Sequence, residues 1–209
     1  MKKKILVLDY KTGNVDSVIK MINMLGYDAI FSSKKDAFDK VNKIILPGQG
    51  SYNHAMQELK KDNILQNLQK KISGENIHVL GICLGMQILS TIGVENTKTN
   101  GLDLIKGEVR IMNNSPNKLP HIGWNTVKFL DEKEKLFEDI QNEKDFYFIH
   151  SYYFFCKNKK NIIATTKYNE EFPSIVKNEN IYGVQFHPEK SLKNGIKLFD
   201  NFLKLKWIK

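Results

Sequence analysis

The feature that most constrains the fold is the segment at residues 79–85, VLGICLG. It begins with a continuous apolar run, which is typical of a strand covered on both faces. The run stops at Gly81, Cys83 and Gly85, where glycine allows the tight turn that leads from a strand into a helix. The segment therefore predicts a buried strand, a sharp turn that holds up a thiol, and a helix after it.

Strands and helices alternate through the first half of the chain. Short apolar runs at residues 5–8, 44–46 and 79–82 predict strands, and apolar residues at helical spacing predict helices at residues 15–25 and 64–72. Strands that are joined through helices are parallel, so we expect a parallel sheet in this half.

The second half has a different texture. Aromatic and β-branched residues fill shorter segments such as residues 146–155 and 162–166, and an amphipathic helix follows near residues 192–203. We expect these strands to extend the sheet in antiparallel fashion. No repeat or linker divides the 209 residues, which suffice for a stable core. The predicted fold is α/β and three-layered, with a mostly parallel central sheet and an antiparallel extension, and residues 1–209 are predicted to form one domain.

Composition excludes several function classes. The net charge of +9 is spread along the chain among 23 acidic residues, which indicates a solvated surface and not a nucleic-acid-binding face. The two cysteines, Cys83 and Cys156, provide no disulfide framework and favour a reducing compartment, and Cys156 is taken as structural. The apolar run at residues 5–8 is too short for a signal peptide or a membrane span. We expect a cytoplasmic protein without nucleic-acid or membrane partners.

Cys83 has two interpretations when it is considered alone. Most unpaired cysteines are small buried hydrophobes. At the start of a helix, however, the partial positive charge of the helix end favours a reactive thiolate. Ligands of open parallel sheets bind where strands end, so Cys83 is expected to meet the loops at residues 9–14 and 47–50.

A second segment, residues 183–189, supplies groups that could act on this thiol. If Val184 and Phe186 face the core, then Gln185 and His187 face the other way, and the proline that follows ends the strand. Glu189 is close enough in sequence to hold the other nitrogen of His187. Together with Cys83 these residues match the nucleophile, base and orienting carboxylate of thiol catalysis.

These motifs resemble those of one enzyme family. GICLGMQ around Cys83 and GVQFHPE with His187 and Glu189 are similar to the nucleophile turn and the His-Pro-Glu motif of the class I (triad) glutamine amidotransferases. The resemblance runs from residue 9 to nearly the end. It implies hydrolysis of the glutamine side-chain amide, with Cys83 as nucleophile, His187 as proton carrier and Glu189 as its orienting partner, and it implies no metal or cofactor.

Within that family the chain is most similar to the glutaminase subunits of imidazole glycerol phosphate synthases. The segments that carry this similarity are PHIGWN at residues 120–125, YFIHSY at residues 147–152 and EKS at residues 189–191. The resemblance implies a role in histidine biosynthesis.

The resemblance also assigns an oxyanion hole and a substrate site. Backbone N–H groups of the loop Gly48-Gln49-Gly50 would join that of Leu84 to bind the negative oxygen of the tetrahedral intermediate. A Pro-Gly loop at this place is otherwise an ordinary strand-to-helix turn. The residues implied to bind L-glutamine are Gly50, Gln87, Glu95, Ser151 and Tyr152. Gln and Glu side chains are otherwise typical of a solvated surface.

A partner is expected because free ammonia would be protonated and lost in water. The resemblance implies a heterodimer with a (β/α)₈-barrel cyclase subunit, which receives the ammonia through a closed passage. The residues placed at or near this interface are Asn14, His121, Trp124, Asn125, Tyr147 and Lys190. Aromatic side chains are common interface anchors, although a Trp after Gly is also an ordinary core residue and a lysine such as Lys190 is more often a solvent-facing charge.

Two residues depart from the family pattern. Lys11 stands where the loop after the first strand usually carries glycine, and Gln49 replaces an aliphatic residue between two glycines. They leave open a paralogue that supplies ammonia for the acetamidino modification of bacterial surface sugars. A catalytically dead scaffold is a third hypothesis, which the intact Cys83, His187 and Glu189 disfavour. A fourth is a cysteine hydrolase that releases its product into solvent.

Overall fold

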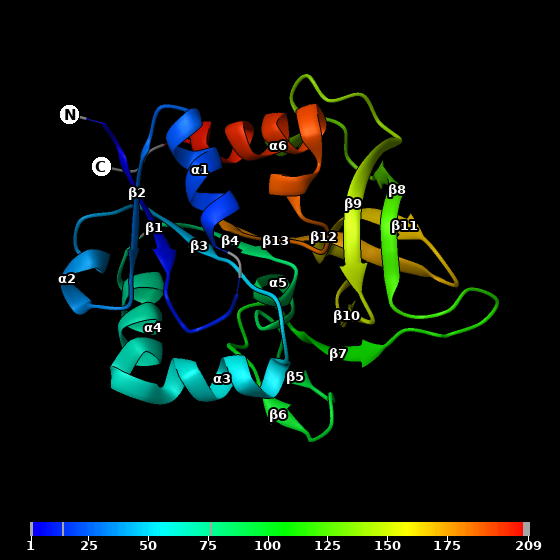
Figure 1. Ribbon diagram of the computed structural model, residues 1–209, viewed down its shortest axis with the longest axis horizontal. Coiled ribbons are helices and arrows are strands. Elements are labelled where there is room, and N and C mark those ends of the chain that lie inside the picture. Colours follow the sequence, from blue (N-terminus) through cyan, green and yellow to red (C-terminus); the bar gives the residue numbers. More distant parts are fainter. Residues whose placement is uncertain (1, 14, 76, 207–209) are drawn as a thin grey trace.

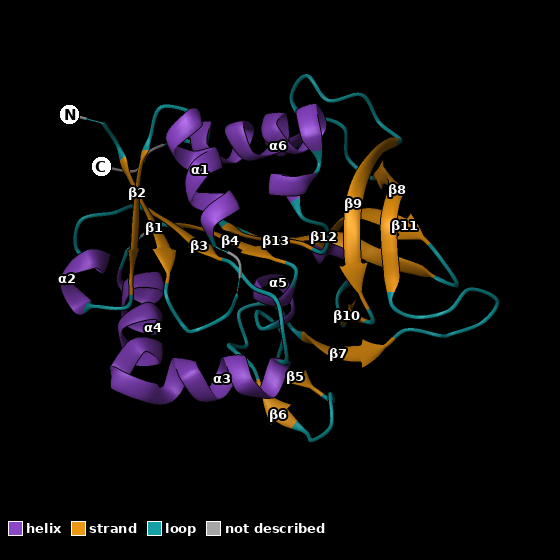
Figure 2. Ribbon diagram, in the orientation of Figure 1, coloured by secondary structure: helices purple, strands orange, loops and turns teal. Residues whose placement is uncertain are grey.

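The computed structural model describes residues 2–13, 15–75 and 77–206. Strands and helices alternate in the first half and strands dominate the second (Figure 1; Figure 2). The helices are α1 (Asp16–Met24), α2 (Lys35–Phe38), α3 (Tyr52–Lys60), α4 (Ile64–Gly74), α5 (Leu84–Gln87) and α6 (Leu192–Lys204). The strands are β1 (Lys4–Leu8), β2 (Asp28–Ser32), β3 (Lys43–Leu46), β4 (His78–Ile82), β5 (Ile92–Gly93), β6 (Thr99–Asn100), β7 (Gly107–Ile111), β8 (His121–Phe129), β9 (Lys144–His150), β10 (Tyr152–Cys156), β11 (Ile162–Lys167), β12 (Glu171–Asn178) and β13 (Ile181–Val184). No helix in these ranges is long and apolar enough to cross a membrane.

A nine-stranded sheet crosses the molecule in the order β2-β1-β3-β4-β13-β12-β11-β8-β9. Within the described residues, the strands from β2 to β13 are paired in parallel. The strands from β13 onward to β9 are paired antiparallel. This confirms the predicted α/β fold with a parallel sheet and an antiparallel extension.

Helices cover both faces of this sheet, and β1 shows why. Its alternate residues enter two separate cores, since Ile5 and Val7 pack in one and Leu6 and Leu8 in the other. Apolar residues of α1 and α6 join the first core, and those of α2, α3 and α4 join the second. The helices accordingly lie above and below the sheet in Figure 1. Each buried aliphatic side chain contributes about 1.5–3 kcal/mol, so the continuous apolar runs hold three layers together, as predicted.

A second sheet has the order β10-β7-β5-β6. The prediction that residues 146–155 extend the central sheet therefore holds for β9 and is wrong for β10, which pairs with β7. The chain changes sheets at Ser151, whose carbonyl accepts a hydrogen bond from the Met112 N–H at 2.9 Å. Phe154 and Cys156 then face the core below the central sheet. Side chains alternate with a period of two in every strand, so the pattern does not reveal which strand is the partner.

The register of three parallel strands brings distant loops together. Gly81 of β4 lies opposite Leu46 of β3 on one side and opposite Gly183 of β13 on the other. The segments that follow these residues therefore leave the sheet next to one another, at the edge where open parallel sheets bind ligands.

Cys83 occupies the sharp turn that the sequence predicts. Its φ of 51° and ψ of −106° are unusual for a residue with a side chain, and such a conformation costs about 1–3 kcal/mol. The turn is held by its N–H, which donates to the Val184 carbonyl at 2.8 Å. A Cβ at Gly81 would lie 2.4 Å from the Gly85 oxygen, and a Cβ at Gly85 would lie 1.8 Å from the Leu46 oxygen. Both glycines are therefore needed for close backbone packing.

We expect Gly85→Ala to lower the free energy of unfolding by more than about 2 kcal/mol, because the new methyl group would overlap the Leu46 carbonyl. Urea unfolding followed by circular dichroism measures this change. Gly74→Ala is the matched control, because a Cβ there meets no atom within 4 Å. Equal stability of the two variants would contradict the proposed packing at the turn.

Candidate active site

The structure brings Cys83, His187 and Glu189 together at the end of the parallel strands. Nδ1 of His187 lies 2.6 Å from Oε1 of Glu189, and both side chains are buried. Burial opposes a charged His187, but interactions with Cys83 and Glu189 outweigh it and raise the pKa of this imidazole. Cys83 and His187 both lie along β9, because the Ile149 carbonyl is 3.8 Å from Sγ of Cys83 and the Tyr147 carbonyl accepts the His187 N–H at 2.9 Å. Nε2 of His187 makes no hydrogen bond to another described residue. Hydrogen bonds between catalytic groups often shorten only when substrate binds.

A cavity of about 220 Å³ gives access to the thiol. Cys83 is only 6% exposed, but its side chain lines this cavity. The lining residues are Gln49, Gly50, Cys83, Leu84, Gln87, Glu95, Ile149, His150, Ser151 and Tyr152. Every residue that was predicted to bind glutamine is among them. Ile149 and His150 were not singled out, although they lie inside the segment that carries the family resemblance.

The loop after β3 lies against the loop after β1. The Pro47 carbonyl accepts hydrogen bonds from the Tyr10 hydroxyl and from Oγ1 of Thr12, the latter at 3.2 Å. Burial raises the pKa of Tyr10 far above its ordinary value, so its hydroxyl remains a donor. A Cβ at Gly48 would lie 3.0 Å from the Leu84 side chain, and Gly50 has a φ of +119°. The loop thus needs both glycines, and Tyr10 and Thr12 fix its start.

Leu84 is the first residue of α5, which is a single turn. The N–H groups in the first turn of a helix have no acceptor within the helix. The Leu84 N–H, which follows Cys83 directly, donates no hydrogen bond to another backbone group among the described residues. Since the helix is so short, the effect of its dipole on Cys83 is smaller than the sequence suggested.

Glu95 and Gln87, which were predicted to bind glutamine, already form hydrogen bonds within the protein. Oε2 of Glu95 accepts a hydrogen bond from the Tyr52 N–H at 2.7 Å, at the start of α3. Nε2 of Gln87 donates to the Tyr152 carbonyl at 2.9 Å and to Oε1 of Gln185 at 3.3 Å. Only the amide oxygen of Gln87 therefore remains for a ligand, and it can only accept a hydrogen bond.

The structure shows where Lys11 and Gln49, the two residues that depart from the family pattern, lie. Lys11 has a φ of 58°, a conformation that glycine adopts most easily, which explains why glycine is usual here. Its amine lies 3.1 Å from Oδ2 of Asp9, and its side chain is exposed. Gln49 is one of the residues that line the cavity.

The residues predicted at the partner interface differ in exposure. Trp124 is 49% exposed and packs edge-on against Tyr147, with ring centroids 6.0 Å apart. The Lys190 amine lies 6.0 Å from the Tyr147 ring centroid. Ile122 and Ile149 face each other across β8 and β9 and are exposed as well. These five side chains form an apolar surface with one positive charge, which we call the β8–β9 face.

His121 and Asn125 lie beneath or beside this surface, and Asn14 falls outside the described residues. The His121 ring is 2% exposed, because it stacks between Phe148 and Tyr168 with centroid distances of 4.8 and 4.1 Å. His121 therefore has almost no side-chain surface to offer a partner. The amide of Asn125 lies 3.1 Å from Nε2 of His121.

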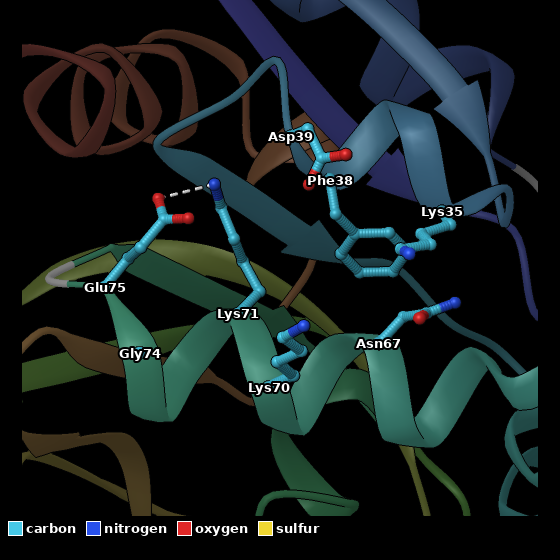
Figure 3. A pocket seen from close by; sticks show the side chains of 8 residues that line it. All are labelled: Lys35, Phe38, Asp39, Asn67, Lys70, Lys71, Gly74 and Glu75. Atoms are coloured by element: carbon cyan, nitrogen blue, oxygen red, sulfur yellow. Dashed lines mark hydrogen bonds and ion pairs between the residues drawn. The ribbon is translucent and has the colours of Figure 1, made fainter.

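Other candidate groups lie apart from this site. A cavity of about 240 Å³ lies between α2 and α4. The Lys71 amine is 2.6 Å from Oε2 of Glu75 there. Figure 3 shows this ion pair and the ring of Phe38, which lies against α4. This cavity shares no lining residue with the cavity at Cys83. Cys156 is buried in β10, and burial raises its pKa to about 12. Such a thiol is unreactive.

Comparison with known proteins agrees with this geometry. The family model "Glutamine amidotransferase class-I" matches residues 6–205, and the chain belongs to this family. The imidazole glycerol phosphate synthase subunit HisH 2 of Methanococcus maripaludis is 46% identical over 96% of this chain and 98% of its own length. Subunit HisH of Pelagibacter ubique is 39% identical over 96% of this chain and 99% of its own length. The structure of PurLQS from Thermotoga maritima has a similar fold, with a TM-score of 0.75 at 20% identity over 97% of this chain and 98% of that one.

The buried histidines predict a loss of stability in acid. Burial lowers the pKa of His121 to about 4 and that of His150 to about 3. Between pH 6.5 and about 4 the unfolded chain binds protons at these residues that the folded chain excludes, so the free energy of unfolding falls as the pH falls. Urea unfolding at pH 7, 6 and 5 measures this slope.

His121→Phe is the variant that tests the assignment. Phenylalanine keeps the stacking, but Nε2 of His150 loses its partner, so we expect a loss of about 1–3 kcal/mol at pH 7. The variant should also show a shallower fall between pH 6.5 and 4, because one titrating group is gone. An unchanged slope would show that His121 is not the group that titrates.

Proposed function

We propose that this chain is the glutaminase subunit of an imidazole glycerol phosphate synthase. It would hydrolyse L-glutamine to glutamate and ammonia, and a synthase partner would use the ammonia to make imidazole glycerol phosphate and aminoimidazole carboxamide ribonucleotide in histidine biosynthesis. The main support is the His187–Glu189 pair beside Cys83, which lines a cavity together with the predicted glutamine-binding residues. The full-length relatives that carry this name add to it.

The first half-reaction forms a thioester. The Cys83 thiolate attacks the carbon of the glutamine side-chain amide, and His187, protonated on Nε2, gives that proton to the departing nitrogen so that ammonia leaves. The raised pKa of His187 favours the protonated ring that this step needs. In the second half-reaction His187 takes a proton from water, hydroxide attacks the glutamyl thioester, and glutamate and the thiolate are released.

Glu189 has an orienting role in both steps. Its carboxylate accepts the Nδ1 proton of His187 and so keeps Nε2 directed at the reacting atoms. The negative charge also stabilises the imidazolium that is present before the first half-reaction and forms again in the second.

Backbone donors stabilise the tetrahedral intermediates. In the proposal the N–H of Leu84 and those of the loop Gly48-Gln49-Gly50 bind the negative oxygen. The loop start is fixed by the Tyr10 and Thr12 hydrogen bonds to Pro47. Gly50 has a φ of +119°, which residues with a side chain rarely adopt, so glycine lets the loop take this conformation.

The substrate contacts follow from the groups that the fold leaves open. Oε1 of Gln87 can accept an N–H of glutamine, and the carboxylate of Glu95 can bind its α-ammonium. Backbone groups of Gly50, Ser151 and Tyr152 complete the proposed site. The Tyr152 carbonyl is not among them, because Gln87 and His150 already occupy it.

The proposed partner is a (β/α)₈ barrel that docks on the β8–β9 face. Ammonia is protonated in water, so a closed passage between the two subunits must replace diffusion. Trp124 and Tyr147 are the proposed anchors and Lys190 the proposed charged contact. As a biosynthetic subunit the protein is proposed to act in the cytoplasm.

A role in surface-sugar modification has less support. Both relatives described above are named as imidazole glycerol phosphate synthase subunits. The exposed Lys11 has a local ion pair and does not line the cavity. Gln49 is the departure that reaches the cavity.

We expect Cys83→Ala to reduce glutamine hydrolysis by at least about 10³-fold, because the nucleophile is removed. The assay measures glutamate production with the cognate barrel and its acceptor nucleotide present. Cys156→Ala is the control, because this buried thiol touches neither the cavity nor His187. If Cys83→Ala kept its activity, the proposed chemistry would be wrong.

Partner dependence tests the pathway. The chain alone should hydrolyse glutamine slowly, and the barrel with the phosphoribulosyl formimino aminoimidazole carboxamide nucleotide should accelerate it strongly. Replacing these components with an amino-sugar amidination system should give no acceleration. Equal rates with and without the barrel would count against channelled ammonia.

We expect Trp124→Ala to weaken binding of the barrel subunit by about 2 kcal/mol or more, because buried aromatic anchors carry much of an interface's binding energy. Isothermal titration calorimetry measures the change. Phe31→Ala is the matched control, because Phe31 is 45% exposed and lies on β2 at the opposite edge of the central sheet. Similar losses in both variants would argue against the β8–β9 face.

A further inference from the structure

Gln185 has no role in the chemistry described so far, yet its side chain reaches the nucleophile. It directly follows β13 and is fully buried, at 0% exposure. Its N–H donates to the Ser174 carbonyl at 2.9 Å, which fixes its backbone. Its side-chain nitrogen Nε2 lies 3.6 Å from Sγ of Cys83, within the range of an N–H···S hydrogen bond. Gln185 does not line the cavity, so it approaches the sulfur from within the protein.

The orientation of this amide follows from hydrogen bonding. The Tyr152 carbonyl can only accept, so the group of Gln87 that lies 2.9 Å from it must be the NH₂. The second N–H of Gln87 then points to the oxygen of Gln185, 3.3 Å away. With its oxygen fixed in this way, Gln185 must present its NH₂ to the sulfur of Cys83. A flipped Gln185 amide would place two NH₂ groups against each other.

The Tyr152 carbonyl also fixes which ring nitrogens of His150 and His121 carry the proton. Nδ1 of His150 lies 2.9 Å from the Tyr152 oxygen and must donate to it, which makes Nε2 of His150 an acceptor. Nδ1 of His121, 3.0 Å from that Nε2, is then the donor. Both lone pairs of the Tyr152 carbonyl are therefore used. No lone pair is left for a third donor such as water. Gln87 therefore keeps its NH₂ on this carbonyl, and the orientation of its amide toward Gln185 is fixed.

We propose that Gln185 is a positioning residue for the nucleophile: its amide N–H donates to the Cys83 sulfur, favours the thiolate and holds it toward the cavity. The inference rests on the proposed function, in which Cys83 attacks glutamine. A hydrogen bond to a charged group is about twice as strong as one between neutral groups. The bond therefore stabilises the thiolate more than the thiol, and it is oriented before substrate arrives.

Gln185→Met tests this role, because methionine has a similar length but no N–H donor. We expect alkylation of Cys83 by iodoacetamide to slow about 10-fold at pH 7. The difference should disappear at high pH, where the thiol is fully ionised in both proteins. Mass spectrometry of the Cys83 peptide measures the rate, and the buried Cys156 serves as an unreactive reference.

A purely structural role gives a different result. If Gln185 only filled space, Gln185→Met would change the rate equally at every pH or leave it unchanged, and either outcome overturns the proposal. Ser174→Ala is the matched control, since its buried hydroxyl has no hydrogen-bond partner among the described residues and its backbone carbonyl, which the substitution keeps, accepts the Gln185 N–H. In Ser174→Ala, Cys83 should be alkylated at the same rate as in the unmodified chain. Gln185→Asn, which keeps the amide but shortens its reach, replaces Gln185→Met if that variant does not fold, and it should show the same pH-dependent slowing.

Glutamine hydrolysis with the barrel subunit separates this proposal from the proposed function. Gln185→Met should lower kcat about 10-fold and leave KM within about twofold, because Gln185 does not touch the cavity. If the unmodified chain hydrolyses no glutamine but alkylation behaves as expected, the proposed function fails and the positioning role stands. If hydrolysis occurs and Gln185→Met alkylates as fast as the unmodified chain at pH 7, the positioning role alone fails.

Discussion

The site depends on the close backbone contact between Gly85 and the Leu46 carbonyl. There is no room for a Cβ at this point, and only because of that does the single turn of α5 lie against the end of β3. The contact brings Cys83 next to the loop that starts at Pro47, and the register of β4 with β13 brings Gln185 to its other side. The strained conformation of Cys83 is maintained by packing and by a backbone hydrogen bond to Val184, so the fold and not local preference holds the thiol in place.

Hydrogen bonding within the protein then decides what the cavity can bind. Most polar groups around it are used inside the protein, as the Tyr152 carbonyl shows, and a used group cannot recognise a ligand. The groups that remain include an oxygen on Gln87, a carboxylate on Glu95, the first N–H groups of α5 and the thiol. Two acceptors and a line of donors beside a nucleophile suit a small molecule with an ammonium group, an amide N–H and a carbonyl oxygen, and L-glutamine has all three.

The sequence predicted local features better than distant partnerships. The run at residues 79–85 predicted the buried strand and the turn at Cys83, because continuous apolarity that ends in paired glycines fits few local structures besides a strand and a tight turn. It could not predict that residues 146–155 divide between two sheets, since alternation with a period of two is common to all strands. It also could not predict the burial of His121, which depends on rings from two distant segments. The alternation places Gln185 on the same side as His187, but its reach to the sulfur depends on Gln87, about a hundred residues away in sequence.

One strand connects the β8–β9 face to the nucleophile. The side chains of Tyr147 and Ile149 on β9 belong to the face where the partner is proposed to dock, and the carbonyls of the same two residues contact the candidate active site. The Tyr147 carbonyl accepts the N–H of His187 at 2.9 Å, and the Ile149 carbonyl lies 3.8 Å from Sγ of Cys83. A carbonyl beside the sulfur disfavours a thiolate, whereas the Gln185 amide favours it. In the proposed complex β9 therefore lies between the docked partner and the sulfur of Cys83.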